Sequence, residues 1–193
     1  MKQKRLLFIA YLLFLGACAT QQQPAAVRVV EVPVRVEVPV EVPVERPHSS
    51  LQRQSGMVLI SKRELTLTLL DSLQNPQLVL PIACGMNYGQ KEMEGDMKTP
   101  EGDFTIREIN DSSAWKHDFK DGLGPVEGAY GPYFVRLLTP PHTGIGIHGT
   151  HLPTSIGSRA TEGCIRLTNS DLRELMRYIY VGMPVRILPD DSE

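Results

Sequence analysis

The sequence Leu65-Thr66-Leu67-Thr68-Leu69-Leu70 alternates an apolar residue with a polar one at a period of two. This pattern is typical of a β-strand that buries one face and exposes the other. Further short runs, apolar or alternating, are bounded by Gly, Pro, Asn or Asp, and they lie at residues 57–61, 78–84, 104–108, 134–138, 145–148 and 185–188. So many short strands predict a mainly β fold, a sandwich or barrel, over residues 51–193.

One segment in the C-terminal half of the chain predicts an α-helix. Thr168 is suited to cap it, because an acidic residue, Asp171, follows three positions later. Apolar residues then recur at helical spacing: Leu172, Leu175, Met176 and Ile179. Gly182 and Pro184 predict its end. We assign this apolar stripe to core packing.

Residues 145–167 combine the groups needed for nucleophilic catalysis by a cysteine. A free thiol with a pKa of about 8.5 is mostly protonated at neutral pH, so Cys164 needs a base. His148 ends a short apolar strand and can be that base. Gly163 lets a substrate carbonyl approach the backbone N–H groups of an oxyanion hole. Arg166 lies two residues beyond Cys164, so an extended chain would place both on one face.

The sequence resembles the catalytic motif of bacterial L,D-transpeptidases, the family with the YkuD-type catalytic domain. The matching segments near the cysteine are His148-Gly149-Thr150, Ser155-Ile156-Gly157 and Thr161-Glu162-Gly163-Cys164-Ile165-Arg166. Two upstream segments, residues 99–106 and 81–85, resemble the family's Thr-Pro-x-Gly-x-Phe segment and the strand before it. The resemblance covers most of residues 57–188.

The resemblance implies a YkuD-like β fold and two-step acyl transfer on peptidoglycan stem peptides, with no cofactor. Cys164 would attack the bond that follows the L-centre of diaminopimelate, releasing D-alanine and forming a thioester that an amine then accepts. His148 would act as base and then as acid, oriented by the carbonyl of Gly149. The N–H groups of Gly163 and Cys164 would stabilise the oxyanion.

The resemblance also bears on substrate contacts. We expect four residues to contact substrate: Arg166, Thr161, Tyr133 and His142. Thr161 replaces the family's usual serine and keeps its hydroxyl. Glu162 stands where the family often has histidine or another basic residue, which bears on the charge preference for the substrate.

Three other functions use the same residues differently. Transfer of the thioester to water would make an L,D-carboxypeptidase, or an amidase that releases wall-attached proteins. A non-catalytic peptidoglycan-binding lipoprotein would need neither Cys164 nor His148. A zinc site built from His142, His148, His151 and Cys164 would lack an acidic ligand at the expected spacing, so no metal is predicted.

Two features near the motif have open interpretations. Cys84 ends an apolar run, so we expect a buried thiol, with a Cys84–Cys164 disulfide as the alternative. Residues 110–133 carry five aromatic or histidine residues (Trp115, His117, Phe119, Tyr130 and Tyr133) in a connection longer than packing requires. We interpret this segment as a substrate-covering lid, with a disordered insertion as the alternative.

The first 17 residues predict an export signal. A basic start, residues 1–5, precedes ten apolar residues, 6–15, which are too few for the roughly 20 that span a bilayer. Residues 15–18, Leu-Gly-Ala-Cys, resemble the lipobox of bacterial lipoproteins, which implies lipidation of Cys18; ordinary cleavage beside an incidental cysteine is the alternative. Ala19 in place of aspartate slightly favours the outer membrane.

Residues 18–50 predict an extended linker. Within residues 27–47, valines alternate with charged residues, and four prolines interrupt them. Proline removes ladder donors, so an extended stalk of about 3.1 Å per residue is favoured over an edge hairpin on the domain. The sequence therefore predicts a lipid-anchored periplasmic enzyme of the cell envelope that reaches the cell wall, where a wall-linked protein is a possible acyl acceptor.

Composition excludes several other classes. The chain has 20 Lys and Arg against 22 Asp and Glu, and three of the basic residues lie in the first 17, so removal of that segment leaves 17 against 22, a net charge of −5. An acidic chain without a basic patch is not expected to bind nucleic acid. Three cysteines without a C-x-x-C pair form neither a disulfide scaffold nor a thioredoxin-type motif.

Overall fold

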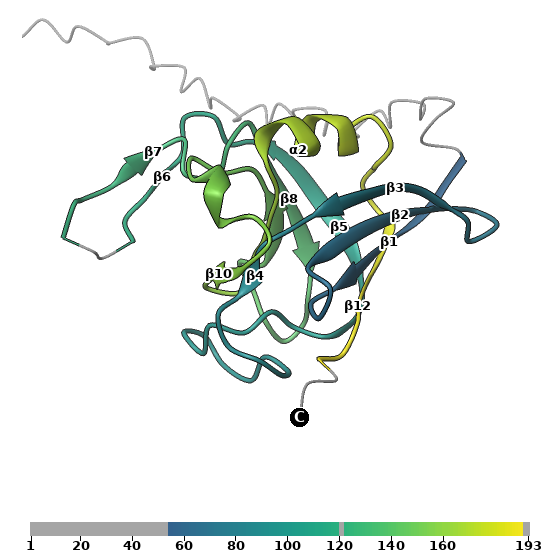
Figure 1. The fold of residues 1–193 in the computed structure, drawn as a ribbon, viewed down its shortest axis with the longest axis horizontal. Helices are drawn as coiled ribbons and strands as arrows, with labels where there is room; N and C mark the ends of the chain where they lie inside the picture. Colours follow the sequence, from purple (N-terminus) through teal and green to yellow (C-terminus); the bar gives the residue numbers. More distant parts are fainter. Residues whose placement is uncertain (1–53, 120–121, 191–193) are drawn as a thin grey trace, which may run out of the picture. The chain divides into compact units, whose positions relative to one another are not determined.

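The computed structural model describes residues 54–119 and 122–190 (Figure 1). Its largest sheet is built from β1 (Ser55–Ser61), β2 (Thr66–Asp71), β3 (Pro76–Pro81), β5 (Gly102–Asp111), β8 (Tyr133–Leu138), β9 (Gly146–His148), β11 (Ile165–Arg166) and β12 (Pro184–Ile187). The strand order is β11-β9-β8-β5-β12-β1-β2-β3. Two small sheets pair β4 (Cys84–Gly85) with β10 (Arg159–Thr161), and β6 (Lys116–His117) with β7 (Val126–Glu127). The predicted mainly β fold is confirmed.

The Leu/Thr alternation forms β2 as predicted. Leu67 and Leu69 are fully buried, whereas Thr66 and Thr68 on the other face are half-buried. β2 pairs antiparallel with both β1 and β3, so its backbone hydrogen bonds are satisfied on both edges. On the other side of β1, β12 runs parallel to it and brings Val185 level with Val58. The sheet's apolar residues meet in one continuous core.

The predicted helix is α2 (Asn169–Leu175), which packs onto this core. The Thr168 hydroxyl accepts a hydrogen bond from the N–H of Asp171 at 3.1 Å, so the predicted cap is confirmed. Leu172 and Leu175 are fully buried. The helix ends at Leu175, earlier than the apolar stripe predicts, and the chain continues in turns that still bury Ile179 in the core.

The single strand predicted over residues 78–84 is wrong, because the chain changes sheets within it. β3 ends at Pro81, which has no N–H for the ladder. Ala83 then exchanges hydrogen bonds with Arg166, and β4 pairs with β10. This crossing carries the chain from β3 to the strands that hold the cysteine motif. β10 and β11 are only three and two residues long, too short for a sequence period to reveal.

Residues 110–133 fold as a connection with its own strands. β5 continues to Asp111, β8 begins at Tyr133, and β6 and β7 form an antiparallel pair between them that projects from the sheet beside β8 (Figure 1). We call residues 112–132, apart from residues 120 and 121, the hairpin. The predicted signal segment, Cys18 and the linker lie outside the described residues. Within the described part of the chain, no helix has the length and apolar character needed to cross a membrane.

Candidate active site

His148 is the last residue of β9, and the sheet register decides where it points. Its neighbour Ile147 faces the core and is fully buried, so His148 faces the opposite side of the sheet. The imidazole is also buried, with 4% of the residue exposed. Its Nδ1 lies 2.6 Å from the carbonyl oxygen of Gly149. Because a carbonyl can only accept, Nδ1 carries the proton and Nε2 keeps a free lone pair.

Gly149 is held in place by the start of α2. A Cβ on Gly149 would lie 2.2 Å from Oδ1 of Asn169, closer than any side chain tolerates. The same Oδ1 accepts the N–H of Thr150 at 2.9 Å. The helix therefore fixes the backbone whose carbonyl orients His148, and it does so only with glycine at this position.

The parallel pairing of β9 with β11 brings Cys164 to His148. Arg166 lies beside His148 and Ile165 beside Ile147. Residues two apart share a face, so Cys164, just before β11, lies on the same face as Arg166 and His148, level with Gly146. Its Sγ is 3.4 Å from the carbonyl oxygen of Gly144. The thiol is partly exposed and free.

Both reacting groups are neutral in the free protein at neutral pH. Burial lowers the pKa of His148 to about 4, and the neighbouring Arg166 and His117 add to this effect, while the bond to the Gly149 carbonyl opposes it. Burial also raises the pKa of the Cys164 thiol, with Glu162 adding to it, although the Gly146 backbone, Arg166 and Arg136 act against it. A thiolate–imidazolium pair is therefore not the resting state of these two side chains.

Arg166 is a buried cation with few partners. It is 7% exposed, and its Nη1 donates to the hydroxyl of Ser155 at 3.0 Å. Its Nε has no hydrogen-bond partner, and it forms no ion pair, within the part of the chain that the structure describes. Burial lowers the pKa of the guanidinium, whereas Cys164 and Glu162 raise it. A positive charge is thus held near the thiol with no ion pair to it among the described residues, although the more distant Glu162 carboxylate favours it.

Thr161 and Gly163 shape the loop that carries the thiol. Thr161 is 3% exposed, and its hydroxyl donates to the carbonyl oxygen of Cys164 at 2.6 Å while it accepts the N–H of Gly163 at 3.2 Å. Gly163 has φ +136°, and a Cβ there would lie 2.7 Å from the carbonyl oxygen of Lys98. The structure therefore places Thr161 inside the loop, not on its surface.

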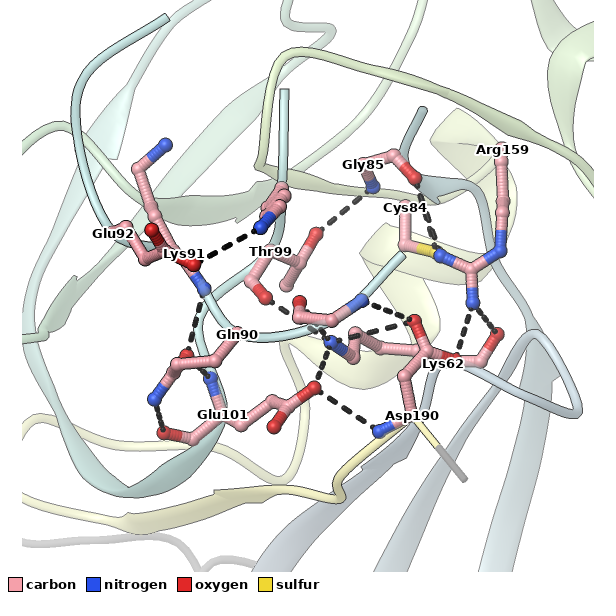
Figure 2. A network of polar contacts seen from close by, with 12 residues as sticks. Lys62, Cys84, Gly85, Gln90, Lys91, Glu92, Thr99, Glu101, Arg159 and Asp190 are labelled. Atoms are coloured by element: carbon pink, nitrogen blue, oxygen red, sulfur yellow. Dashed lines mark hydrogen bonds and ion pairs between the residues drawn. The ribbon is translucent and has the colours of Figure 1, made fainter. Parts of the chain in front are cut away.

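A network of charged residues supports this loop from the side of β4 and β10 (Figure 2). We call Lys62, Glu101, Arg159 and Asp190 the buried charge cluster. Nζ of Lys62 lies 2.5 Å from Glu101 and 3.5 Å from Asp190, and Arg159 lies 2.6 Å from Asp190. Arg159 begins β10, which leads directly into the cysteine loop.

The segment 99–106 meets the same network. The hydroxyl of Thr99, which is fully buried, accepts the N–H of Gly85 at 2.9 Å, and the carbonyl of Thr99 accepts from Lys62 at 3.3 Å (Figure 2). Glu101, two residues later, is part of the buried charge cluster. The segment therefore ties β4, and through it β10, to the core.

Aromatic side chains cover His148 on the face that bears Cys164. The Phe134 ring stacks on the imidazole with centroids 5.5 Å apart and planes 7° apart, and the Tyr130 ring meets it edge-on at 5.0 Å. The Tyr130 hydroxyl lies 2.8 Å from Nδ1 of His117. Trp115 packs against both Tyr130 and Phe134. The hairpin thus contributes the cover that buries the base.

Sequence reasoning missed the contact of Phe134 with His148. The position of Phe134 in β8, the strand next to β9, could have indicated this contact, because the register places Phe134 directly beside His148. Tyr133, expected to contact substrate, is adjacent in β8 and so faces the other way, where it packs against the core. The structure does not bring Tyr133 to the thiol.

His142 lies in the turn between β8 and β9, away from His148. Its N–H donates to the Thr139 carbonyl at 2.7 Å. It lines a groove of about 360 Å³ together with Arg107, Arg136 and Gly144, the residue whose carbonyl contacts the Cys164 thiol. We call this the β8–β9 groove. Across the described residues, no three His, Cys, Asp or Glu side chains lie close enough to hold a metal ion.

Cys84 is fully buried, as expected, with burial raising the pKa of its thiol. Both Cys84 and Cys164 are free thiols, so the disulfide is not formed in this structure. Sγ of Cys84 lies 3.9 Å from the carbonyl oxygen of Gly85, next to the buried charge cluster.

Known proteins resemble this chain in sequence and in the arrangement of their strands. The L,D-transpeptidase YkuD of Bacillus subtilis is 32% identical over 132 residues, and the match covers 67% of this chain but only 63% of that protein. In fold, the chain resembles the catalytic domain of the Enterococcus faecium L,D-transpeptidase (20% identity, TM-score 0.51, 70% of this chain and 98% of that one). It also resembles L,D-transpeptidase 3 of Mycobacterium tuberculosis, solved with a faropenem-derived adduct (18% identity, TM-score 0.52, 70% of this chain and 60% of that one).

The family is established by a match that spans most of the described residues. The model of the L,D-transpeptidase catalytic domain, the YkuD family, matches residues 55–187, which include the cysteine loop, His148 and the segment 99–106. The chain belongs to the YkuD family of L,D-transpeptidase catalytic domains.

Proposed function

We propose that this protein is an L,D-transpeptidase that remodels peptidoglycan through a thioester at Cys164. The observation that carries the proposal is the placement of a partly exposed thiol and a neutral imidazole on one face of two adjacent strands. The hydrogen bond from Nδ1 to the Gly149 carbonyl leaves Nε2 as the available base. This is the geometry that cysteine acyl transfer needs.

Acylation proceeds by attack of Sγ on the carbonyl carbon that links diaminopimelate to the terminal D-alanine. The thiol proton passes to Nε2 of His148, and the carbonyl oxygen becomes an oxyanion. The C–N bond then breaks, and the imidazolium returns the proton to the departing amine. D-Alanine leaves, and the stem tripeptide is held as a thioester.

Deacylation reverses the roles of the same groups. An acceptor amine attacks the thioester carbonyl and gives a proton to His148 as the new C–N bond forms. The C–S bond breaks, and the thiolate takes the proton back. The imidazole, buried under Phe134 and Tyr130, is restored in its neutral form.

Two features stabilise charge during these steps. The N–H of Gly163 already donates to Thr161, so we assign the oxyanion chiefly to the N–H of Cys164. Arg166 supplies an uncompensated positive charge beside the sulfur, which favours the thiolate as it forms. His142, Arg107 and Arg136 line the β8–β9 groove, whose basic side chains suit the carboxylates of a donor stem peptide.

Export and lipidation at Cys18 complete the proposal. The short apolar run and the following Leu15-Gly16-Ala17-Cys18 support a lipid anchor in the cell envelope, with residues 18–50 as the linker to the periplasmic catalytic domain. A lipid anchor would place the enzyme beside its polymeric substrate. Labelling with a fatty-acid analogue, lost in Cys18→Ser, tests this part.

Intact-mass measurement tests the catalytic proposal. The chain without residues 1–17, carrying Cys18→Ser, is incubated with a carbapenem and separately with a tetrapeptide-stem muropeptide. We expect one carbapenem adduct at Cys164 and loss of D-alanine from the muropeptide, because a β-lactam carbonyl acylates the same thiol. The Mycobacterium tuberculosis structure with its faropenem-derived adduct supports this expectation.

Two variants sharpen that measurement. Cys84→Ser should still form the adduct, and Cys164→Ser should form none while it keeps the fold by circular dichroism. Absence of both adduct and D-alanine release from the folded, reduced protein would overturn the proposal. The released products also identify the acceptor, because cross-linked and hydrolysed muropeptides differ in mass.

A further inference from the structure

Glu162 places a negative charge at the rim of the site. It lies two residues before Cys164 in the turn between β10 and β11, and its side chain is 58% exposed. The nearest basic side-chain atom among the described residues is Nε2 of His117, at 3.9 Å from Oε1, beyond hydrogen-bonding distance. Within the described residues no hydrogen bond engages this carboxylate. Its charge is therefore open to a ligand in solution.

The thiol lies between two surfaces of different charge. Cys164 is level with Gly146, and β9 runs from there to His148, where the hairpin residues Tyr130 and His117 gather. The β8–β9 groove lies at the other end of β9, beside Gly144, and Arg107 and His142 line it together with the Arg136–Glu108 ion pair. Glu162 reaches toward the hairpin end, as its contact with His117 shows.

Three other charged residues near the site are engaged or shielded. Arg166 is almost fully buried and bound to Ser155. Arg136, on the groove side, pairs with Glu108 at 2.6 Å. On the hairpin, Lys116 pairs with Glu127 at 3.1 Å. The charge of Glu162 also reaches the site, since it adds to burial in raising the pKa of the Cys164 thiol and of the neighbouring Tyr130.

We propose that Glu162 selects the acyl acceptor, favouring a cationic amine with no neighbouring carboxylate over a zwitterionic amino acid. This inference rests on the proposed function. An ammonium group is attracted to the Glu162 carboxylate and its unprotonated fraction attacks the thioester, whereas a carboxylate on the acceptor is repelled from the same rim. Lysine ε-amines and the α-amines of amidated residues meet this description.

Competition between glycinamide and glycine tests the proposal, because the two differ only in a carboxamide or a carboxylate. The thioester is formed from a tetrapeptide-stem muropeptide, and transfer is compared at equal concentrations of unprotonated amine. We expect wild-type protein to favour glycinamide by about tenfold, which corresponds to one neighbouring charge interaction of modest strength. Glu162→Gln should reduce this preference to about twofold, and Glu162→Lys should reverse it.

Controls separate charge selection from damage to the site. Glu127→Gln removes a similarly exposed carboxylate from the hairpin and should leave the preference unchanged. Carbapenem adduct formation by each Glu162 variant shows that the thiol is still reactive. Equal transfer to glycinamide and glycine by a wild-type protein that forms the thioester would overturn the role of Glu162 and leave the proposed function intact. Failure to form any thioester would overturn both.

Discussion

Lys62 and Arg166 are two buried cations in one small domain, with opposite surroundings. The Lys62 side chain is fully buried and faces two carboxylates, Glu101 and Asp190. Arg166 is 7% exposed, yet a serine hydroxyl is its side-chain partner, and its Nε is without one among the described residues. The Lys62 charge is neutralised by carboxylates in contact with it, whereas the Arg166 charge has no such contact among the described residues.

The difference fits a structural role for the Lys62 charge and the functional role proposed for the Arg166 charge. Carboxylates around Lys62 offset the cost of removing an ammonium from water, so the buried charge cluster can link distant segments. An unpaired guanidinium at Arg166 carries that cost without an ionic partner. Uncompensated charges of this kind are typical of active sites, where the compensating negative charge arises only during the reaction.

Lys62→Met removes the paired buried cation and should have the largest effect on the free energy of unfolding. The substitution leaves Glu101 without its cation and Asp190 with Arg159 alone in a buried site, so we expect a loss of about 3–5 kcal/mol in the free energy of unfolding. Urea unfolding followed by circular dichroism measures it. A change below about 1 kcal/mol would mean that the cluster is not a structural link.

The pH dependence of stability probes the neutral base beside Arg166. The pKa of His148 falls from an ordinary value near 6.5 to about 4 on folding, so the unfolded chain binds the proton first as pH falls. Stability should therefore be full above pH 6.5 and decline toward pH 4, by about 3 kcal/mol for this group. Urea unfolding across this range, compared with His148→Gln, isolates the contribution. The variant should lack this part of the decline, and parallel curves would contradict the assignment.

Arg166→Met removes the unpaired cation and should affect chemistry more than stability. We expect thioester formation to slow by about 100-fold, or about 2.7 kcal/mol in the activation barrier. The free energy of unfolding should change by less than about 1 kcal/mol, because an uncompensated buried charge is removed. Alkylation rates measured against pH should show a raised pKa for the Cys164 thiol. Arg166→Lys should recover part of the rate, and equal losses in stability and rate would show a merely structural role.

Lys116→Met should have the smallest effect on the free energy of unfolding. It serves as the reference for the substitutions at Lys62 and Arg166. Lys116 and Glu127 pair on the hairpin with side chains 59% and 68% exposed. Such an exposed pair contributes about 0–1 kcal/mol, so urea unfolding should scarcely change. A loss comparable with that of Lys62→Met would mean that burial does not distinguish the two ion pairs.

Patterns of neighbouring residues in the sequence predicted the strands and the helix that depend on those neighbours. The Leu/Thr alternation of β2 and the Thr168 cap of α2 were read directly, since each depends on neighbours a few residues away. The motif around His148 and Cys164 pointed to the site. The contacts of Phe134 and Tyr130 with His148 depend on pairing between strands, and the pattern of one strand does not contain that register.

The buried charge cluster shows the same limit more strongly. Lys62, Glu101 and Asp190 come from three separate parts of the chain, and in sequence each is an ordinary charged residue. Their pairing follows from the parallel alignment of β1 with β12 and from the antiparallel alignment of β12 with β5, the strand that Glu101 directly precedes. Tyr133 and Phe134 are adjacent in β8, and successive side chains of a strand point to opposite faces. Phe134 therefore contacts His148, whereas Tyr133 packs against the core.

The two described cysteines differ in exposure, so thiol labelling can measure how much of a protein preparation is folded. Cys84 is fully enclosed, whereas the Cys164 thiol is partly exposed. In a chain carrying Cys18→Ser, a bulky maleimide should therefore count one thiol per native molecule and two after denaturation. The ratio of the native count to the denatured count falls from one for unfolded protein to one half for fully folded protein. The fraction of correctly folded protein is calculated from it, and every rate measured on a preparation can be expressed per competent molecule.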